Sequence, residues 1–319
     1  NPACPPEEGY KALASEAEKL YAFKSRDGIH WSLLRPEPIL TKSEFDSQNL
    51  AFWHPGWQKY LEFHRGWKTE IRDVRHSTSS DFRNWTEPQW LDWGEAPTEH
   101  LYTNGILPYL RAPHILIGFP MRFVPERKAG EHKFPGVSDS LFMSSRDGLR
   151  WKRWPESFLR PGLQEERWVN RNNMIGWGLL LTKSDLPGAP AELSLYSSEG
   201  YYVKNCRMRR HTLRLDGFVS INAGAAGGEM ITKPLVFEGQ ELIINFSTSA
   251  AGSIRIEIQD ERGQPIDGFA LGEGPEIFGD SVEHVVRWRQ GSSLEKLAGR
   301  VVKLRFLLRD ADLYSLRFK

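Results

Sequence analysis

A seven-residue pattern that occurs three times constrains the fold more than any other feature. Residues 25–31, 79–85 and 145–151 each carry Ser at the first position, Asp at the third and Trp at the seventh. Each copy leaves one apolar run and enters another. Because Asp and Gly suit a tight turn, we expect a hairpin at each copy, with the Trp opening the next strand and packed between sheets. The N-terminal two thirds is therefore predicted to be a β-repeat protein.

The spacing of these turns predicts the kind of repeat. Asp27, Asp81 and Asp147 lie 54 and 66 residues apart, and a weaker fourth copy brings Glu199 to 52 residues beyond Asp147. Periods of this length with strand-like content fit one four-stranded propeller blade per repeat, whereas helical solenoid repeats are usually shorter. Helix-period patterning is almost absent, so we predict an all-β fold built on a β-propeller.

The predicted blade strands follow from the apolar runs between the turns. Residues 1–18 read as an extended arm with a short helical turn, and the blades begin after it. The clearest blade has strands at 49–53, 60–64, 74–78 and 88–93, the next at 102–110, 114–121, 140–144 and 158–160, and a further one begins at 174–182 and 192–197.

The composition changes near Arg214, where the Asp-to-Trp repeat stops. Short alternating strands at even spacing follow, which is the pattern of a β-sandwich or jelly roll. We therefore predict two domains, a propeller over 1–212 and an accessory β-sandwich over 213–319. The sandwich strands are expected at 241–246, 253–258, 284–288, 301–308 and 314–318.

Charge and composition exclude several partners and sites. A net charge of +1 gives no long-range field to attract nucleic acid or a membrane surface, and the longest apolar stretches are too short to span a bilayer. Two cysteines, Cys4 and Cys206, are too few for a disulfide scaffold, although one bridge between them is an open alternative. The motifs of serine hydrolases, zinc proteases and dinucleotide-binding enzymes are missing, so no metal and no cofactor is predicted.

The propeller geometry nominates a set of carboxylates. The first strand of every blade lines the central channel in the same direction, so residues just before these strands converge on one face. Asp46, Glu99 and either Glu165 or Glu166 occupy these places. Cleavage of a glycosidic bond needs one carboxyl as proton donor and another as base or nucleophile, which such a set supplies. The alternative is that these acids are solvated loop residues or turn caps.

Residues at neighbouring strand ends are expected to bind a sugar beside these acids. Arginines there suit bidentate hydrogen bonds to hydroxyls or to a carboxylate or sulfate on a sugar, or else serve as structural partners of the acids. Aromatic rings near the same rim suit stacking on a sugar ring. The predicted substrate-binding residues are Arg65, Arg122, Trp53, Trp168, Asn104 and Asp139.

These turns and acids, together with the appended β-domain, resemble the five-bladed propeller glycoside hydrolases of families 32 and 43. Residues 45–49, 99–104 and 213–218 are more closely similar to a group of bacterial proteins labelled family-32-like. The resemblance implies a channel-facing trio of base or nucleophile, transition-state stabiliser and proton donor. By blade order these are Asp46, Glu99 and Glu166. The family-32 signatures Trp-Met-Asn-Asp-Pro, Arg-Asp-Pro and Glu-Cys are missing from this chain.

The resemblance also implies that the chain starts inside the propeller, because related chains carry more blade sequence ahead of this point. About 200 residues at about 50 per blade supply close to four blades. A missing N-terminal segment, a companion chain or a smaller propeller would each account for this. The expected function is a bacterial glycosidase acting on a carbohydrate, secreted or periplasmic, and the alternative is a non-catalytic carbohydrate-binding propeller.

Overall fold

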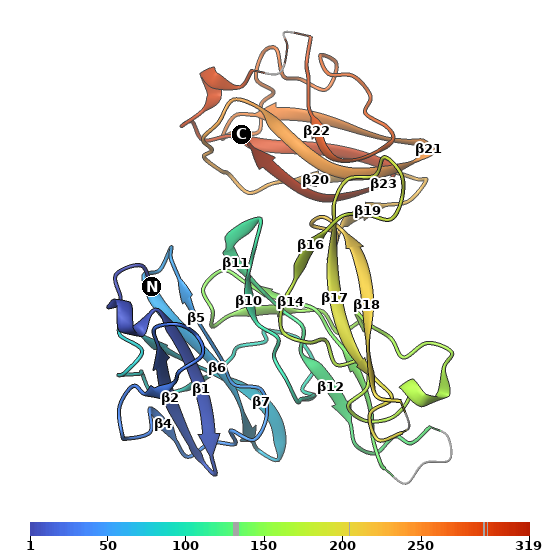
Figure 1. Cartoon of the computed structure of the whole chain (residues 1–319). Coiled ribbons are helices and arrows are strands. Elements are labelled where there is room, and N and C mark those ends of the chain that lie inside the picture. Colours follow the sequence, from blue (N-terminus) through green and yellow to red (C-terminus); the bar gives the residue numbers. More distant parts are fainter. Residues whose placement is uncertain (130–133, 204, 290, 292) are drawn as a thin grey trace. The chain divides into compact units, whose positions relative to one another are not determined.

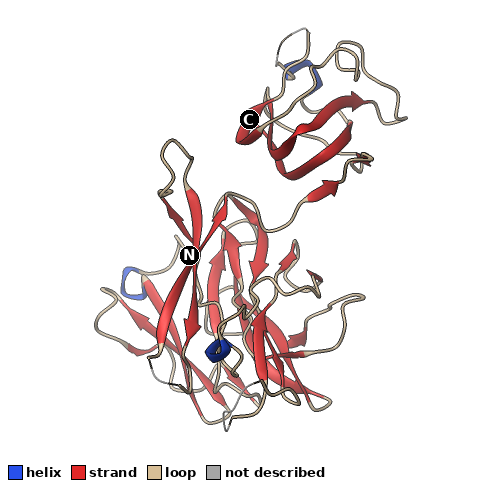
Figure 2. Ribbon diagram, turned by 90° about the vertical axis from the view of Figure 1, so that its right-hand side faces the viewer, coloured by secondary structure: helices blue, strands red, loops and turns tan. Residues whose placement is uncertain are grey.

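The computed structural model describes residues 1–129, 134–203, 205–289, 291 and 293–319, and this part of the chain consists almost wholly of strands and loops. Its helical turns are short 3-10 segments, η1 (Pro6–Glu8), η2 (Glu165–Arg167) and η3 (Glu295–Leu297) (Figure 2). The all-β fold class is confirmed. No helix in the described ranges is long and apolar enough to cross a bilayer.

The chain forms two compact units. The first comprises Asn1–Leu180 and Ser194–His211, and the second comprises Leu181–Leu193 and Thr212–Lys319. The domain boundary predicted after residue 212 lies beside the point where the chain returns to the second unit. Cys4 and Cys206 form no disulfide with each other.

The first sheet begins earlier than the sequence indicated. Strand β1 (Tyr10–Glu16) pairs antiparallel with β2 (Lys19–Ser25) along its whole length, within the segment expected to be an arm. Its residues are all exposed or only partly buried, so it lacks the alternating apolar pattern by which a strand is recognised. Strands β3 (Ser32–Leu33) and β4 (Leu40–Thr41) complete the sheet on β2.

The second sheet is the antiparallel meander predicted from the repeat. Strands β5 (Leu50–His54), β6 (Lys59–Lys68), β7 (Ile71–Ser79) and β8 (Gln89–Trp90) are neighbours in chain order (Figure 1). Residues 60–66 of β6 are all buried, because both faces of this sheet are covered. Leu61 and Phe63 belong to one apolar cluster, whereas Tyr60 belongs to another with Phe45 and Phe82.

The third repeat contains a hairpin that the sequence analysis did not separate. Its four-stranded sheet consists of β10 (Leu107–Tyr109), β11 (Ala112–Gly118), β14 (Met143–Ser145) and β15 (Trp151–Arg153). A smaller sheet joins β9 (His100–Leu101), β12 (Met121–Val124) and β13 (Val137–Ser140). The outer strand expected at 158–160 is instead β15, and Leu159 makes only an isolated bridge to Ser140. A last sheet contains β16 (Leu180–Thr182), β17 (Glu192–Glu199) and β18 (Arg207–Arg214).

The three copies of the repeat form the same turn. In the first copy Ser25 Oγ accepts the Gly28 N–H at 2.9 Å, and Asp27 Oδ1 accepts the N–H groups of Ile29 and His30, both at 2.8 Å. The Trp indole N–H then donates to the carbonyl three residues earlier, at 3.1, 3.1 and 3.0 Å for Trp31, Trp85 and Trp151. The burial of the Trp side chain differs among the copies: Trp151 is 4% exposed and Trp31 is 42% exposed. The expectation that all three are buried is therefore wrong for Trp31.

The second unit is built on two long strands. Strand β21 (Leu242–Gln259) pairs antiparallel with β23 (Lys303–Phe318), and the register shifts between Thr248 and Ser253. Strands expected separately at 241–246 and 253–258 are thus one continuous strand with an irregularity in its middle. The remaining strands of the sheet are β19 (Ile221–Ala223), β20 (Gly228–Ile231) and β22 (Asp280–Val285). The β-sandwich itself stays a prediction.

Two histidines and a glutamate are buried in the second sheet. The His64 ring lies 2.9 Å from a carboxylate oxygen of Glu62, and both side chains are inaccessible to solvent. Burial raises the pKa of Glu62 although His64 opposes the shift. His76 stacks on Phe63 at 4.5 Å, and its Nδ1 donates to the Glu62 carbonyl oxygen at 3.0 Å. Burial lowers the pKa of His76 to about 4.

We expect His76 to make the protein acid-sensitive. On acidification the unfolded chain binds a proton near pH 6.5, whereas the folded state resists protonation until about pH 4. The stability present at neutral pH is therefore lost as the pH falls through this interval, by about 3 kcal/mol for this group. His76→Gln should lessen the loss of stability between pH 7 and pH 4.5 by about 2 kcal/mol in urea unfolding, because Glu62 and His64 remain in both proteins. His114→Gln, at an exposed position, is the control. An unchanged pH dependence in His76→Gln would contradict the assignment.

Candidate functional site

Three strand-opening segments, residues 46–49, 102–105 and 171–173, contact one another in the first unit. Ser47 Oγ donates to the Tyr102 carbonyl at 2.9 Å, and Gln48 Oε1 accepts the Asn104 and Gly105 N–H groups at 3.1 and 2.8 Å. Arg171 Nη2 donates to the Tyr102 hydroxyl at 3.1 Å. Segments more than 50 residues apart thus meet at one place.

The third of these segments differs from the one expected. The sequence predicts Glu165 or Glu166 at this position, but residues 173–176 pair with β17, through Asn173 N–H to Ser198 O and Gly176 N–H to Tyr196 O. Arg171 lies two residues before this pairing. An arginine, rather than a carboxylate, therefore meets Tyr102 at the third segment.

A cavity of about 570 Å³ lies in the same unit. Four residues nominated from the sequence line it, namely Glu99, Arg122, Asp139 and Trp168. Arg127, Arg160, Ser138 and Ser157 add further polar groups, and Val124 and Val137 supply apolar wall. The volume is within the range of small-ligand sites, and the lining combines an aromatic ring with a few polar groups.

One arginine holds two carboxylates at this cavity. Arg122 Nε and Nη2 donate to the two Asp139 carboxylate oxygens at 2.9 and 2.6 Å, and its Nη1 donates to Glu99 at 2.9 Å. The pairing of β12 with β13 places Arg122 directly opposite Asp139, while β9 brings Leu101 opposite Arg122. Burial alone would lower the pKa of Arg122, but the hydrogen bonds and negative charges of Asp139 and Glu99 outweigh it and raise the pKa.

This arrangement limits the separation of the two acids. Two carboxylates in contact with one guanidinium group lie no farther apart than about 9.5 Å, the upper limit for the acid pair of inverting glycoside hydrolases. A second arginine, Arg153, binds the other Glu99 oxygen at 2.5 Å and is 2% exposed. The Glu99 side chain is therefore held in position by two guanidinium groups.

The cavity wall also presents an aromatic face. Trp168 follows η2 and is 36% exposed, and its indole N–H donates to the Gly162 carbonyl at 2.7 Å. This hydrogen bond fixes the ring while leaving part of its surface open. Such a ring suits stacking on a sugar.

Asp46 and Arg65 lie where the first two strand-opening segments meet. The Arg65 guanidinium donates to the Asp46 carboxylate, and its central carbon lies 4.8 Å from the centre of the Tyr102 ring. The Arg65 side chain is 5% exposed, whereas that of Asp46 is 63% exposed. Asp46 thus lies within reach of an arginine.

Three other nominated residues do not line the cavity. Glu166 forms an ion pair with Arg207 at 2.7 Å, with both side chains about two fifths exposed. Trp53 packs edge-on against Tyr60 at 4.9 Å beside a buried cluster. Asn104 is 1% exposed, and its side-chain oxygen accepts the Ile106 N–H at 3.2 Å. The catalytic role of Glu166 and the sugar-binding roles of Trp53 and Asn104 stay predictions.

Sequence reasoning missed Arg153, Arg171 and Tyr102. Arg153 shares a face of β15 with the repeat residue Trp151, two positions earlier, and that spacing is the signal by which it was detectable. Arg171 has no such signal, because a loop rather than a regular strand carries it. Its φ of 67° lies in the left-handed region, which is costly for a residue with a side chain.

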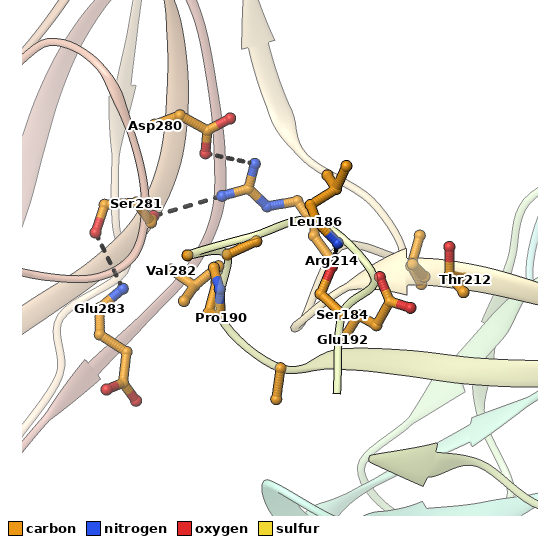
Figure 3. Close-up of a pocket in the computed structure, with 14 residues that line it drawn as sticks. Ser184, Leu186, Pro190, Glu192, Thr212, Arg214, Asp280, Ser281, Val282 and Glu283 are labelled. Atoms are coloured by element: carbon orange, nitrogen blue, oxygen red, sulfur yellow. Dashed lines mark hydrogen bonds and ion pairs between the residues drawn. The ribbon is translucent and has the colours of Figure 1, made fainter. Parts of the chain in front are cut away.

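A larger cavity of about 740 Å³ belongs to the second unit and contains none of the nominated residues. Figure 3 shows Arg214 extended toward Asp280 and Ser281, with an ion pair of 2.9 Å to Asp280 and a 3.4 Å hydrogen bond to the Ser281 carbonyl. The carboxylate side chains of Asp280 and Glu283 are 68% and 51% exposed, as expected for ordinary surface groups. Within the described ranges no three His, Cys, Asp or Glu side chains are grouped as metal ligands.

Comparisons with known proteins find similarity in structure only. No protein-family model matches the sequence, and no curated protein matches it. An N-acetylgalactosamine deacetylase from F. plautii, solved with blood group B trisaccharide, superposes at a TM-score of 0.40 with 11% identity, over 57% of this chain and 55% of that one. A glycosyl hydrolase from Bacteroides ovatus gives 0.39 and 12%, over 64% and 62%.

One further matched structure covers nearly the whole chain. A family 32 β-fructofuranosidase from Bombyx mori superposes at a TM-score of 0.35 with 12% identity, over 97% of this chain and 76% of that one. The chain spans less than two thirds of the deacetylase and of the Bacteroides hydrolase. Activity and substrate are therefore inferred below from the residues of this chain.

Proposed function

We propose that this chain is a glycoside hydrolase and that its reaction takes place at the cavity of Glu99 and Asp139. The observation that carries the proposal is the pair of carboxylates on Arg122, beside the partly exposed ring of Trp168. The transition state of glycoside hydrolysis is positively charged on the sugar ring, so two carboxylates in one cavity suit it. The aromatic ring and the cavity arginines would bind and orient the sugar.

Each acid is proposed to have a distinct role. Glu99 is the base or nucleophile, because Arg122 and Arg153 hold it in one position. Asp139 orients Arg122 and adds negative charge near the sugar. Asp46 is the third acid of the proposal; it belongs to the segment that contacts Tyr102, three residues beyond Glu99, and its largely exposed carboxylate is paired with Arg65.

A non-catalytic carbohydrate-binding propeller is the second candidate. The observation that favours it is that Glu99, Asp139, Asp46 and Glu166 all form ion pairs with arginines. Such pairs also suit a site that only binds hydroxyl groups. The two candidates differ in whether a glycosidic bond is cleaved.

A screen of the protein against aryl-glycosides and polysaccharides separates the candidates. Release of the aryl group or of new reducing ends supports the hydrolase. Proton NMR then identifies which anomer of the sugar forms first, and this shows whether the anomeric configuration is retained or inverted. If a polysaccharide in the gel slows the migration of the protein in affinity electrophoresis and no cleavage occurs, the binding propeller is supported. Absence of both cleavage and binding across the screen would contradict both.

A further inference from the structure

Three arginines surround the ring of Tyr102, at the place where the strand-opening segments meet. The central guanidinium carbons of Arg65, Arg171 and Arg72 lie 4.8, 5.5 and 5.7 Å from the centre of that ring. Each arginine comes from a different strand or loop, namely β6 for Arg65, β7 for Arg72 and the loop between η2 and β16 for Arg171. We call Arg65, Arg72, Arg171 and Tyr102 the arginine cluster.

The positive charge of this cluster is not balanced by the described part of the chain. Arg65 is paired with Asp46, but Arg72 and Arg171 form no ion pair with any described carboxylate. The Arg72 guanidinium is held instead by aromatic rings, at 4.3 Å from Trp67 and 5.6 Å from Phe123. Arg171 donates to two tyrosine hydroxyls, those of Tyr201 at 3.0 Å and Tyr102 at 3.1 Å.

The positive charges of neighbouring arginines repel one another, and this repulsion contributes to a lowered pKa of Arg72. Burial and then the positive charge of Arg65 lower the pKa of Arg72, while Tyr102 and Asp46 oppose the shift. The Nε atoms of all three arginines are buried and have no hydrogen-bond partner within the described residues. Aromatic faces hold guanidinium groups in place without neutralising them, so the cluster remains positive and preorganised.

We infer that the arginine cluster binds the anionic group of an acidic carbohydrate, either a uronate carboxylate or a sulfate ester. Guanidinium groups match the planar carboxylate and the oxygens of a sulfate through paired hydrogen bonds. Arg72, Arg171 and Tyr102 are all partly exposed, so an anion can reach them from solvent. The substrate class rests on the proposed carbohydrate site, to which the segment from Glu99 to Tyr102 connects the cluster.

Equilibrium binding tests this inference without any turnover. Isothermal titration would compare oligogalacturonate with its fully methyl-esterified form, which has the same backbone but no charge, and oligo-carrageenan with a neutral galactan oligomer. The protein should bind at least one anionic oligomer about tenfold or more tightly than its neutral counterpart. Because the net charge is only +1, the general attraction of the protein to polyanions is weak. The galacturonate and carrageenan arms distinguish carboxylate from sulfate.

Two variants and a charge-matched control assign the binding to the cluster. Arg72→Gln and Arg171→Gln should each remove most of the preference for the anionic oligomer. Arg75→Gln is the control, because it changes the net charge by the same amount and Arg75 lies on β7, as Arg72 does. It should preserve the preference for the anionic oligomer, since Arg75 lies outside the arginine cluster, where it stacks on Trp90 at 5.1 Å and donates to the Pro88 carbonyl. Equal binding of anionic and neutral oligomers by the unmodified protein overturns the inference, whether or not a variant folds. A preference that persists in both folded variants overturns it as well. Hydrolysis of a neutral glycoside alongside either result would leave the proposed hydrolase intact.

Discussion

Replacing Glu99 with glutamine is expected to lower glycoside hydrolysis by at least about 100-fold, the loss typical when a carboxylate acting as base or nucleophile is removed. Glutamine keeps the size of the side chain and an oxygen that accepts hydrogen bonds from Arg122 and Arg153, but it lacks the negative charge. Turnover of the best aryl-glycoside from the screen gives the measurement. It should be made well below the melting temperature of each variant.

A matched variant separates the loss of chemistry from a loss of fold. Glu99 neutralises Arg153, whose side chain is 1% exposed, so Glu99→Gln breaks a buried ion pair, which generally costs about 3 to 5 kcal/mol. Glu8→Gln makes the same change at another buried carboxylate, which is paired with Arg83 and with Lys11 at 3.5 Å in a different part of the unit. It should destabilise the protein without loss of turnover per folded molecule. Folded Glu99→Gln protein with undiminished turnover would remove the reaction from this cavity.

The parts of the fold that were predictable from sequence are those fixed by local hydrogen bonds. The Ser and Asp side chains of each repeat satisfy the N–H groups of their own turn, so the pattern specifies a hairpin wherever it occurs. The meander of β5 to β8 follows, since its strands alternate regularly between these turns. The hairpin of β12 and β13 was not separable, because the run from 114 to 121 reads as one apolar strand although the chain leaves β11 at Gly118 and starts β12 at Met121.

The candidate site was predictable where position within a repeat decides it, and not where long-range contacts do. Glu99 and Asp46 precede strands in the sequence, so the repeat nominated them. The register of β12 and β13 then joins Arg122 to Asp139 across 17 positions, and no local pattern encodes that register. Arg171 and Tyr102 meet across 69 positions, and the arginine cluster depends on contacts of this length. Sequence therefore indicated the residue types of the site better than their partners.

The repeat tryptophans provide the second large effect, since the same turn occurs in different degrees of burial. Trp151→Ala is expected to lower the free energy of unfolding by about 3 to 5 kcal/mol. The ring is 4% exposed and belongs to the apolar cluster of Leu61 and Phe63, with its centre 6.2 Å from that of Phe63. Removing it leaves a large cavity between sheets. Urea unfolding followed by far-ultraviolet circular dichroism measures the change without relying on tryptophan emission.

Trp31→Ala is the matched control for this prediction. Trp31 is 42% exposed and donates the same indole hydrogen bond to its turn, at 3.1 Å to the Gly28 carbonyl. Its loss should cost only the net value of one hydrogen bond and limited packing, about 1 kcal/mol. If the turn itself were the main source of stability, the two variants would lose similar amounts. If burial between sheets is the source, Trp151→Ala should lower the free energy of unfolding by about 2 kcal/mol or more beyond the loss in Trp31→Ala. Equal losses would show that packing of the repeat tryptophan does not hold the sheets together.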